Sequence, residues 1–349
     1  MSQLTIALDA MGGDSGAEMV VEGTAIATKR ITDANFLVFG DQGVLDPLIA
    51  AHGGLSDRVE IRHTDLEITA EDKPSNAVRR GQKSSMGLAV AAVRDGEAQV
   101  AVSAGNTGAL MALSKVLLRT LPGIDRPALA TLIPTRGRDT VMLDLGANVE
   151  AGVENLVQFA VMGAAFARTV LGLERPAVGL LNVGVEELKG HGTVKATGQL
   201  LRDTTLPLEF SGFIEGDGIS AGVVDVLVTD GFTGNIAIKT AEGTAKLISA
   251  MLADAFQAGF ISRIGYFLAN PGLNALRSHL DPNSHNGAVF LGLNGLVVKS
   301  HGNANPKGFA TAIGVAERMA QANLCRLISD DLTNFGHHDQ LEQKMVGVE

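Results

Sequence analysis

The chain has 349 residues, of which 46% are hydrophobic and 19% are charged, and its net charge is −10. This composition supplies a large buried core and is unlike that of a disordered chain. The negative charge, the lack of a basic arm and an aromatic content of only 4% argue against nucleic acid as a ligand. A single cysteine, Cys325, excludes an internal disulfide and a cysteine-built zinc site.

The N-terminal segment MSQLTIALDA begins with a strand pattern and lacks the basic-then-apolar order of a signal peptide. No apolar run reaches the ~18–20 uninterrupted residues that span a bilayer. We therefore expect a cytoplasmic protein. No His, Asp or Glu cluster has catalytic-metal spacing, so we expect neither a metal nor a cofactor.

Short β-branched runs alternate with helix-length segments almost to the end of the chain, which predicts an α/β fold with a doubly wound, mostly parallel sheet. Strands are expected at Leu4–Leu8, Asn35–Phe39, Val59–His63, Gln99–Ser103, Ala128–Pro134, Thr140–Leu143, Ala177–Val183, Leu208–Ile214, Val224–Thr229 and Leu296–Lys299. Helices are expected at Ala17–Arg30, Ser84–Arg94, Gly108–Arg119, Gly152–Val170 and Gly192–Arg202. Because no linker or repeat divides the chain, we predict one composite domain over residues 1–335 and a polar tail over 336–349.

Residues 234–282 interrupt the alternation of strands and helices, and their pattern predicts a pair of helices without a strand. Apolar residues from Ala245 to Phe256 recur at helical spacing, and Phe260–Leu268 is apolar without a matching polar face. Two interpretations fit these patterns. The helices are either ordinary core helices or a protruding pair that dimerises or contacts a membrane through residues 256–273.

Six of the predicted strands end in loops of small residues. Backbone N–H groups at glycines and helix N-termini attract anions, and Asn, Ser and Thr add neutral donors. Each loop alone is also typical of an ordinary strand–helix turn. Because ligands bind beyond the carboxyl ends of strands in an open parallel sheet, we expect the loops to converge at one edge on a pocket for phosphate or a developing oxyanion. The candidate ligand-binding residues are Asp9, Gly12, Gly13, Ser103, Gly105, Asn106, Thr107, Gly108, Asn148, Asn182, Asp230, Thr233, Gly234 and His301.

Lys189 lies among glycines between a predicted strand and a predicted helix. It is either a clamp for phosphate or an oxyanion, or a solvated loop lysine. His191 and His301 are candidates to donate to an oxyanion, to move a proton or to make structural hydrogen bonds.

The known nucleotide and hydrolase motifs are missing. No P-loop or GxSxG string exists, and the GxGxxA match at Gly216–Ala221 leaves no room for a crossover helix. Phosphate that attacks a thioester needs no protein base, because much of it is dianionic at neutral pH. Positioning and oxyanion stabilisation then suffice for catalysis.

Several of these loops, in their order along the chain, strongly resemble those of the bacterial phosphate acyltransferase family. The motifs are Ile6–Asp14, Ser84–Met86, Ser103–Ala109, Asn182–Gly184 with Lys189-Gly190, Thr229–Asn235, Leu291–Gly295 and Ser300–Gly302. Ser284–Ala288 departs from the family pattern, in which we expect a Tyr or a Gly-Gly element, and this departure concerns the local shape of the pocket.

The resemblance implies transfer of a fatty acyl group from acyl carrier protein to inorganic phosphate, which gives acyl phosphate for phospholipid synthesis. It also implies a fold similar to phosphotransacetylases and isopropylmalate dehydrogenases, a homodimer, peripheral membrane association and a glycerol-3-phosphate acyltransferase as partner. Lys189 and Asn235 are expected at the reacting centre. The residues implied to line the site are Ser103, Asn106, Thr107, Asn148, Asn182 and His301.

Three other functions stay open at this point. A short-chain phosphotransacetylase that uses acyl-CoA would share the anion-binding loops but gives no reason for an apolar helical protrusion. A dehydrogenase on the same fold would use a metal-binding aspartate cluster, which the sequence does not show. A non-catalytic membrane scaffold would not depend on Lys189.

Overall fold

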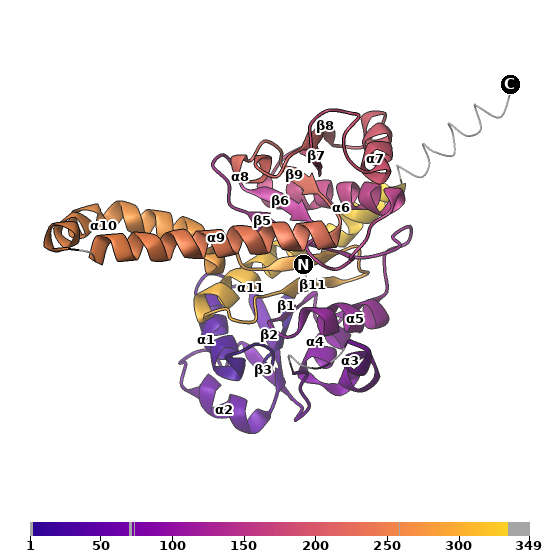
Figure 1. Ribbon diagram of the computed structural model, residues 1–349. Helices are drawn as coiled ribbons and strands as arrows, with labels where there is room; N and C mark the ends of the chain where they lie inside the picture. Colours follow the sequence, from indigo (N-terminus) through magenta and orange to yellow (C-terminus); the bar gives the residue numbers. More distant parts are fainter. Residues whose placement is uncertain (1–2, 70–71, 73, 258, 334–349) are drawn as a thin grey trace.

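The computed structural model describes residues 3–69, 72, 74–257 and 259–333, so the predicted polar tail at 336–349 lies outside the described residues. The described strands form one sheet in the order β3-β2-β1-β4-β11-β10-β5-β6-β9-β7-β8, with helices on both faces (Figure 1). The strands are β1 (Leu4–Asp9), β2 (Ala34–Gly40), β3 (Val59–His63), β4 (Val100–Ser103), β5 (Ala128–Ile133), β6 (Thr140–Leu143), β7 (Ala177–Leu181), β8 (Glu209–Ile214), β9 (Val226–Val228), β10 (Ala288–Leu291) and β11 (Leu296–Lys299). The helices are α1 (Gly16–Thr28), α2 (Gln42–Ala50), α3 (Pro74–Arg80), α4 (Ser85–Arg94), α5 (Thr107–Leu118), α6 (Val153–Leu171), α7 (Gly192–Arg202), α8 (Gly218–Ala221), α9 (Gly231–Gln257), α10 (Phe260–Leu280) and α11 (Pro306–Gln321).

Both faces of the sheet are buried at its centre, which explains why strands such as β4, β9 and β10 are almost wholly apolar. The edge strands β3 and β8 instead carry exposed polar residues. In β1, Ile6 and Leu8 enter one hydrophobic core and Ala7 enters the other. α1 and α11 pack together over the first face, and α4 packs against β1, β2 and β4 from the second. The short helix α8 separates β8 from β9, so the Gly216–Ala221 match does not open a crossover helix.

The sheet is mostly parallel, as predicted, but three antiparallel pairings interrupt it at its centre. β10 pairs antiparallel with β11 and with β5, and β5 pairs antiparallel with β6. The strands β6, β7, β8 and β9 therefore run opposite to β1, β2, β3, β4 and β11. The expectation that all six small-residue loops share one edge is wrong for this reason. They form two sets, the first after β1, β4 and β11 and the second after β6, β7 and β9.

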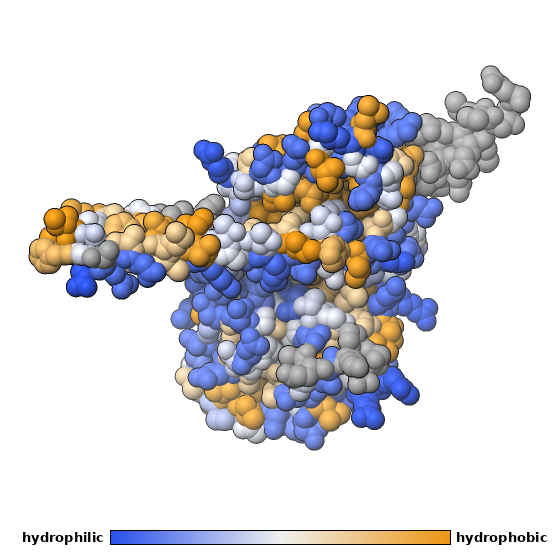
Figure 2. All heavy atoms as spheres, viewed as in Figure 1, coloured by the Kyte–Doolittle hydropathy of each residue, from blue (hydrophilic) through white to orange (hydrophobic). Residues whose placement is uncertain are grey.

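α9 and α10 form an arm that projects from the body of the molecule (Figure 1), and the interrupting residues 234–282 fall mostly within them. The two helices pack on each other, and the rings of Phe256 and Tyr266 meet with their centroids 5.4 Å apart. Figure 2 shows apolar residues along one side of the arm and at its tip, and hydrophilic residues along the other side. The exposed apolar side chains of the arm include Leu247, Ile248, Met251, Leu252, Phe260, Ile261, Ile264, Phe267 and Leu268. Within the described ranges, no helix is both long and apolar enough to traverse a bilayer.

Candidate functional site

A cavity of about 560 Å³ opens where the first set of loops meets, and the segment after β3 closes one of its sides. Small residues form most of the wall, so backbone atoms reach the space directly. The cavity is lined by Met11, Gly13, Asp14, Glu67, Ile68, Thr69, Ala104, Gly105, Asn106, Thr107, Gly108, Lys299 and Gly302.

Asp9 supports this wall from behind, at the end of β1, where it is almost fully buried. Ser103 Oγ donates to Asp9 Oδ2 at 2.6 Å and accepts a hydrogen bond from Gly105 N at 3.0 Å. Burial raises the pKa of Asp9, and hydrogen bonds from Ser103 and Ser85 oppose that effect. A Cβ on Gly12 would stand 2.5 Å from Asp9 Oδ2, so only glycine fits there. These residues join the β1 and β4 loops.

The helix α5 begins at the cavity and directs its positive end into it. Asn106 is the N-cap, and its Oδ1 accepts a hydrogen bond from Ala109 N at 3.0 Å. Thr107 and Gly108 follow in the first turn, where backbone amides have no intrahelical acceptor. Both residues line the cavity, which makes this end of α5 suitable for an anion.

Lys299 is the last residue of β11 and is only 8% exposed. Its Nζ donates to Ala104 O at 3.3 Å and also to Ser300 O. Burial lowers the pKa of Lys299 to about 8, although Asp9 and Asp14 act to raise it. The sequence patterns do not single out Lys299 as a site residue. The sequence feature that could have indicated Lys299 is its position as a lysine at the end of a strand that is buried on both faces.

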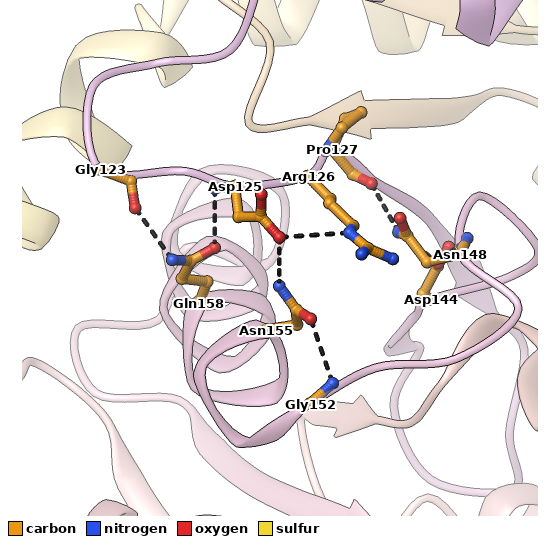
Figure 3. Close-up of polar contacts among 9 residues, drawn as sticks. All are labelled: Gly123, Asp125, Arg126, Pro127, Asp144, Asn148, Gly152, Asn155 and Gln158. Carbon is orange, nitrogen blue, oxygen red and sulfur yellow. Dashed lines mark hydrogen bonds and ion pairs between the residues drawn. The ribbon is translucent and has the colours of Figure 1, made fainter.

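The loop after β6 is organised by the buried carboxylate of Asp144. This carboxylate accepts hydrogen bonds from Leu129 N and Ala147 N, each at 3.0 Å, and from Asn148 N at 2.7 Å. Asn148 Nδ2 donates to Asp144 Oδ2 at 2.9 Å and to Pro127 O at 2.8 Å (Figure 3). Burial raises the pKa of Asp144, and these hydrogen bonds oppose it. The side-chain amide of Asn148 therefore holds the loop in place.

Lys189 lies in the exposed loop after β7. Its Nζ pairs with Glu186 Oε1 at 2.8 Å, which raises the pKa of Lys189 and lowers that of Glu186. Asn182 Nδ2 donates to the carbonyl oxygens of Gly184 and Lys189, each at 3.1 Å, and so closes the loop. His191 follows as the exposed N-cap residue of α7.

The first turn of α9 packs against the β6 loop. A Cβ on Gly234 would stand 2.0 Å from Asp144 O, which leaves room for glycine only. Asn235, the next residue, is exposed at the same corner. Asp230 accepts hydrogen bonds from Thr233 N and Thr233 Oγ1, each at 2.8 Å, and so fixes this turn.

α9 also reaches the first set of loops. Lys239 lies one helical turn after Asn235, about 6 Å along the axis, and pairs with Glu242 at 2.9 Å. The charge of Lys239 acts on both Lys299 and His301. Partial burial lowers the pKa of His301, Glu242 opposes this, and the neighbouring lysines reinforce it. α9 therefore starts at the β6 loop and carries Lys239 within electrostatic reach of Lys299 and His301 near the end of β11.

The predicted residues divide between four places in the structure. Those that line the cavity are Gly13, Gly105, Asn106, Thr107 and Gly108. Those that support its wall are Asp9, Gly12 and Ser103. Eight residues lie in the second set of loops or at the starts of α7 and α9: Asn148, Asn182, Lys189, His191, Asp230, Thr233, Gly234 and Asn235. His301 lies in the loop after β11. The chemical roles assigned to these residues stay predictions.

Comparison with known proteins adds three findings. A family model described as "Fatty acid synthesis protein" matches residues 4–327. The phosphate acyltransferase of Parvibaculum lavamentivorans is 56% identical over 330 residues, which cover 94% of this chain and 91% of the relative. The phosphate acyltransferase of Rhodospirillum rubrum is 50% identical over 331 residues, which cover 95% of this chain and 95% of the relative.

Among solved structures, a phosphotransacetylase from Streptococcus pyogenes matches with a TM-score of 0.59 at 16% identity, covering 91% of this chain and 94% of that one. EutD phosphotransacetylase from Staphylococcus aureus matches with a TM-score of 0.56 at 16% identity and the same coverage. At this level of identity the two structures show the fold alone, and they confirm the predicted phosphotransacetylase-like fold.

Proposed function

Because this chain belongs to the family of fatty acid synthesis proteins that includes the phosphate acyltransferases, we propose that it transfers a fatty acyl group from acyl carrier protein to inorganic phosphate. The products are acyl phosphate and the free carrier-protein thiol, and the acyl phosphate feeds phospholipid synthesis. The observation that carries this proposal is the cavity at the start of α5, whose glycines and first-turn amides suit a small oxyanion.

The reaction needs positioning more than proton transfer. A phosphate oxygen attacks the thioester carbonyl carbon, a C–O bond forms, the C–S bond breaks, and the departing thiolate takes a proton from water. The second ionisation of phosphate has a pKa of ~6–7, so much of the attacking phosphate is dianionic at neutral pH. The leaving thiol has a pKa of ~8.5 and needs little assistance from an acid. Holding the phosphate and stabilising the carbonyl oxyanion are then the main tasks.

We assign these two tasks to the two sets of loops. Gly13 and the Ser103–Gly108 segment hold phosphate, and Lys189 with Asn235 stabilises the oxyanion of the tetrahedral intermediate. The Lys189 side chain is 53% exposed and paired with Glu186, so it must exchange this partner for the substrate. Water screens an exposed ion pair, so the exchange costs little.

The test is a trapping assay. Long-chain acyl carrier protein, phosphate and enzyme are mixed, and hydroxylamine converts any acyl phosphate into a hydroxamate. We expect hydroxamate only when phosphate is present, and faster with long-chain acyl carrier protein than with acetyl-CoA. The absence of hydroxamate with an active acyl carrier protein refutes the proposal, and a preference for acetyl-CoA replaces it with short-chain phosphotransacetylase activity.

The arm supports the remaining parts of the proposal. The arm exposes apolar residues, among them Phe260 and Ile261 at the start of α10. Figure 2 shows apolar residues along one side of the arm and hydrophilic residues along the other, which is typical of helices that lie in a membrane interface. We infer a cytoplasmic homodimer that contacts the membrane peripherally through residues 256–273. An amphiphilic product released at that surface is accessible to a glycerol-3-phosphate acyltransferase, the proposed partner.

A further inference from the structure

Lys299 is a buried ammonium group in the wall of the cavity, and no carboxylate of the described residues pairs with it at contact distance. The acceptors described for its three N–H donors are two backbone carbonyl oxygens, those of Ala104 and Ser300. The charges of Asp9 and Asp14 act on it. Among the described residues, however, neither carboxylate forms an ion pair with it.

This arrangement is costly unless an anion completes it. A charge removed from water needs a partner of opposite sign, because backbone carbonyls replace only part of its hydration. Asp9 does not serve as that partner, since Ser103 Oγ and the amide of Met11 already donate to its carboxylate. The missing counter-charge is therefore available to a ligand in the cavity.

The same cavity offers further donors to an anion of phosphate size. Thr107 and Gly108 contribute first-turn amides of α5. The carboxylates of Asp14 and Glu67 also line the cavity, and both residues are exposed, so water screens their repulsion of an incoming anion. Lys299 is the cation that lines this wall within the described residues.

We propose that Lys299 binds the attacking inorganic phosphate, with its ammonium group donating to one phosphate oxygen and the first-turn amides of α5 donating to others. This assignment rests on the proposed function and adds to it a phosphate-binding residue. The phosphodiester of a carrier protein's pantetheine arm has related chemistry, and the experiment separates the two sources.

The environment of Lys299 gives the proposal a pH signature. Its pKa of about 8 means that the ammonium is mostly protonated at pH 7 and is lost as the pH rises through 8. Asp9 and Asp14 raise this pKa and Lys239 lowers it, whereas the pKa of His301 is already below its ordinary value. The dianionic fraction of phosphate only increases over this range, so titration of phosphate itself would not weaken its binding to a cation. Phosphate affinity should therefore fall above pH 8.

The experiment compares the wild type with Lys299→Met, Lys299→Arg and the control Lys307→Met, an exposed lysine at the start of α11. At pH 7, Lys299→Met should raise the KM for phosphate about 10- to 100-fold, the loss expected for a charge-assisted hydrogen bond. The KM for acyl carrier protein should not change. Lys299→Arg should retain binding at pH 7 and lose the alkaline decline, because arginine stays protonated. Lys307→Met should behave as the wild type.

A second measurement separates this inference from the proposed function. Binding of inorganic phosphate to the free enzyme, followed by calorimetry, needs no turnover and should weaken in Lys299→Met even if no acyl transfer is detected. Unchanged phosphate binding in that variant overturns the inference, as does a change confined to the KM for acyl carrier protein. If Lys299→Met does not fold, a decline near pH 8 that persists in Lys299→Arg overturns it.

Discussion

Two lysines of the candidate site occupy opposite environments. The side chain of Lys189 is half exposed and paired with Glu186, whereas Lys299 is buried and held by backbone carbonyls. Water screens the charge of Lys189, so the field of that lysine falls off within a short distance. The low dielectric around Lys299 lets its field extend into the cavity. One lysine therefore suits a contact made during the reaction, and the other suits a permanent anion site.

Replacement of Lys189 by methionine should lower kcat about 10²-fold or more, because a principal oxyanion contact is lost. The KM for phosphate should stay near the wild-type value, since Lys189 does not line the cavity. Steady-state kinetics with varied phosphate measures both constants. Lys307→Met, the exposed lysine at the start of α11, serves as the control. Wild-type turnover in Lys189→Met would refute the role.

Asp9→Asn should move the alkaline decline of phosphate affinity to a lower pH. The Asp9 carboxylate raises the pKa of Lys299 through its charge, so its neutralisation makes the ammonium easier to deprotonate. The pH dependence of the KM for phosphate measures the shift. Asp46→Asn, on the exposed side of α2, removes a carboxylate that does not act on Lys299 and should leave the profile unchanged. A shift to higher pH in Asp9→Asn would contradict this electrostatic account.

Among the helices and strands, α9 contributes to three parts of the molecule. Its first turn touches the β6 loop through Gly234, its next turns bring Lys239 toward the β11 loop, and its far half forms the arm. The same helix therefore carries a candidate catalytic residue, Asn235, and the exposed apolar surface (Figures 1 and 2). A displacement at its start alters the relation between the two sets of loops.

Two Gly→Ala changes in α9 should have opposite effects. Gly234→Ala places a Cβ 2.0 Å from Asp144 O, and the resulting overpacking should cost about 1–3 kcal/mol of unfolding free energy and reduce kcat. Gly243→Ala meets nothing within 4 Å and should stabilise the helix by up to ~1 kcal/mol. Urea unfolding and turnover measure both variants. Equal stability changes in the two would show that α9 does not rest on the β6 loop as described.

At the scale of the whole molecule, sequence patterns predict the strands better than their directions. The run Leu4–Leu8 predicts β1 because a strand buried on both faces needs apolar side chains at every position. The reversal at β5 and β10 depends on pairing between distant residues, which local patterns do not contain. β10 (Ala288–Leu291) was not predicted; its four residues stand directly between two glycines, Gly287 and Gly292, which are typical of a turn.

The candidate site was predictable to a similar extent. Glycine-rich loops pointed to an anion, and the cavity contains five of the predicted residues, among them Gly13 and Asn106. Lys299 was missed because a lysine is almost always exposed, and only the surrounding structure shows that this one is not. The separation into two sets of loops also follows from strand direction, so no loop sequence reveals it.

The arm makes a prediction for the intact protein. The double change Ile261→Asp and Phe267→Asp introduces charge at exposed apolar positions near its tip and should abolish flotation with phospholipid vesicles. Hydroxamate formation in solution should continue, because neither residue lies at the cavity. Val44→Asp, at an exposed apolar position on α2, is the control. Undiminished flotation of the double variant would exclude the arm as the membrane contact.

The place of β11 in the sheet affects how the protein folds during its synthesis on the ribosome. Val100 of β4 pairs with Leu296 of β11, which is synthesised 196 residues later. At a synthesis rate of ~5–20 residues per second, the edge of β4 that pairs with β11 stays unpaired for about 10–40 s. Such an edge invites pairing with other chains, so a nascent polypeptide at this stage is a natural client for chaperones. Lys299 arrives with the same strand, so the capacity to hold an anion emerges only when that edge is sealed.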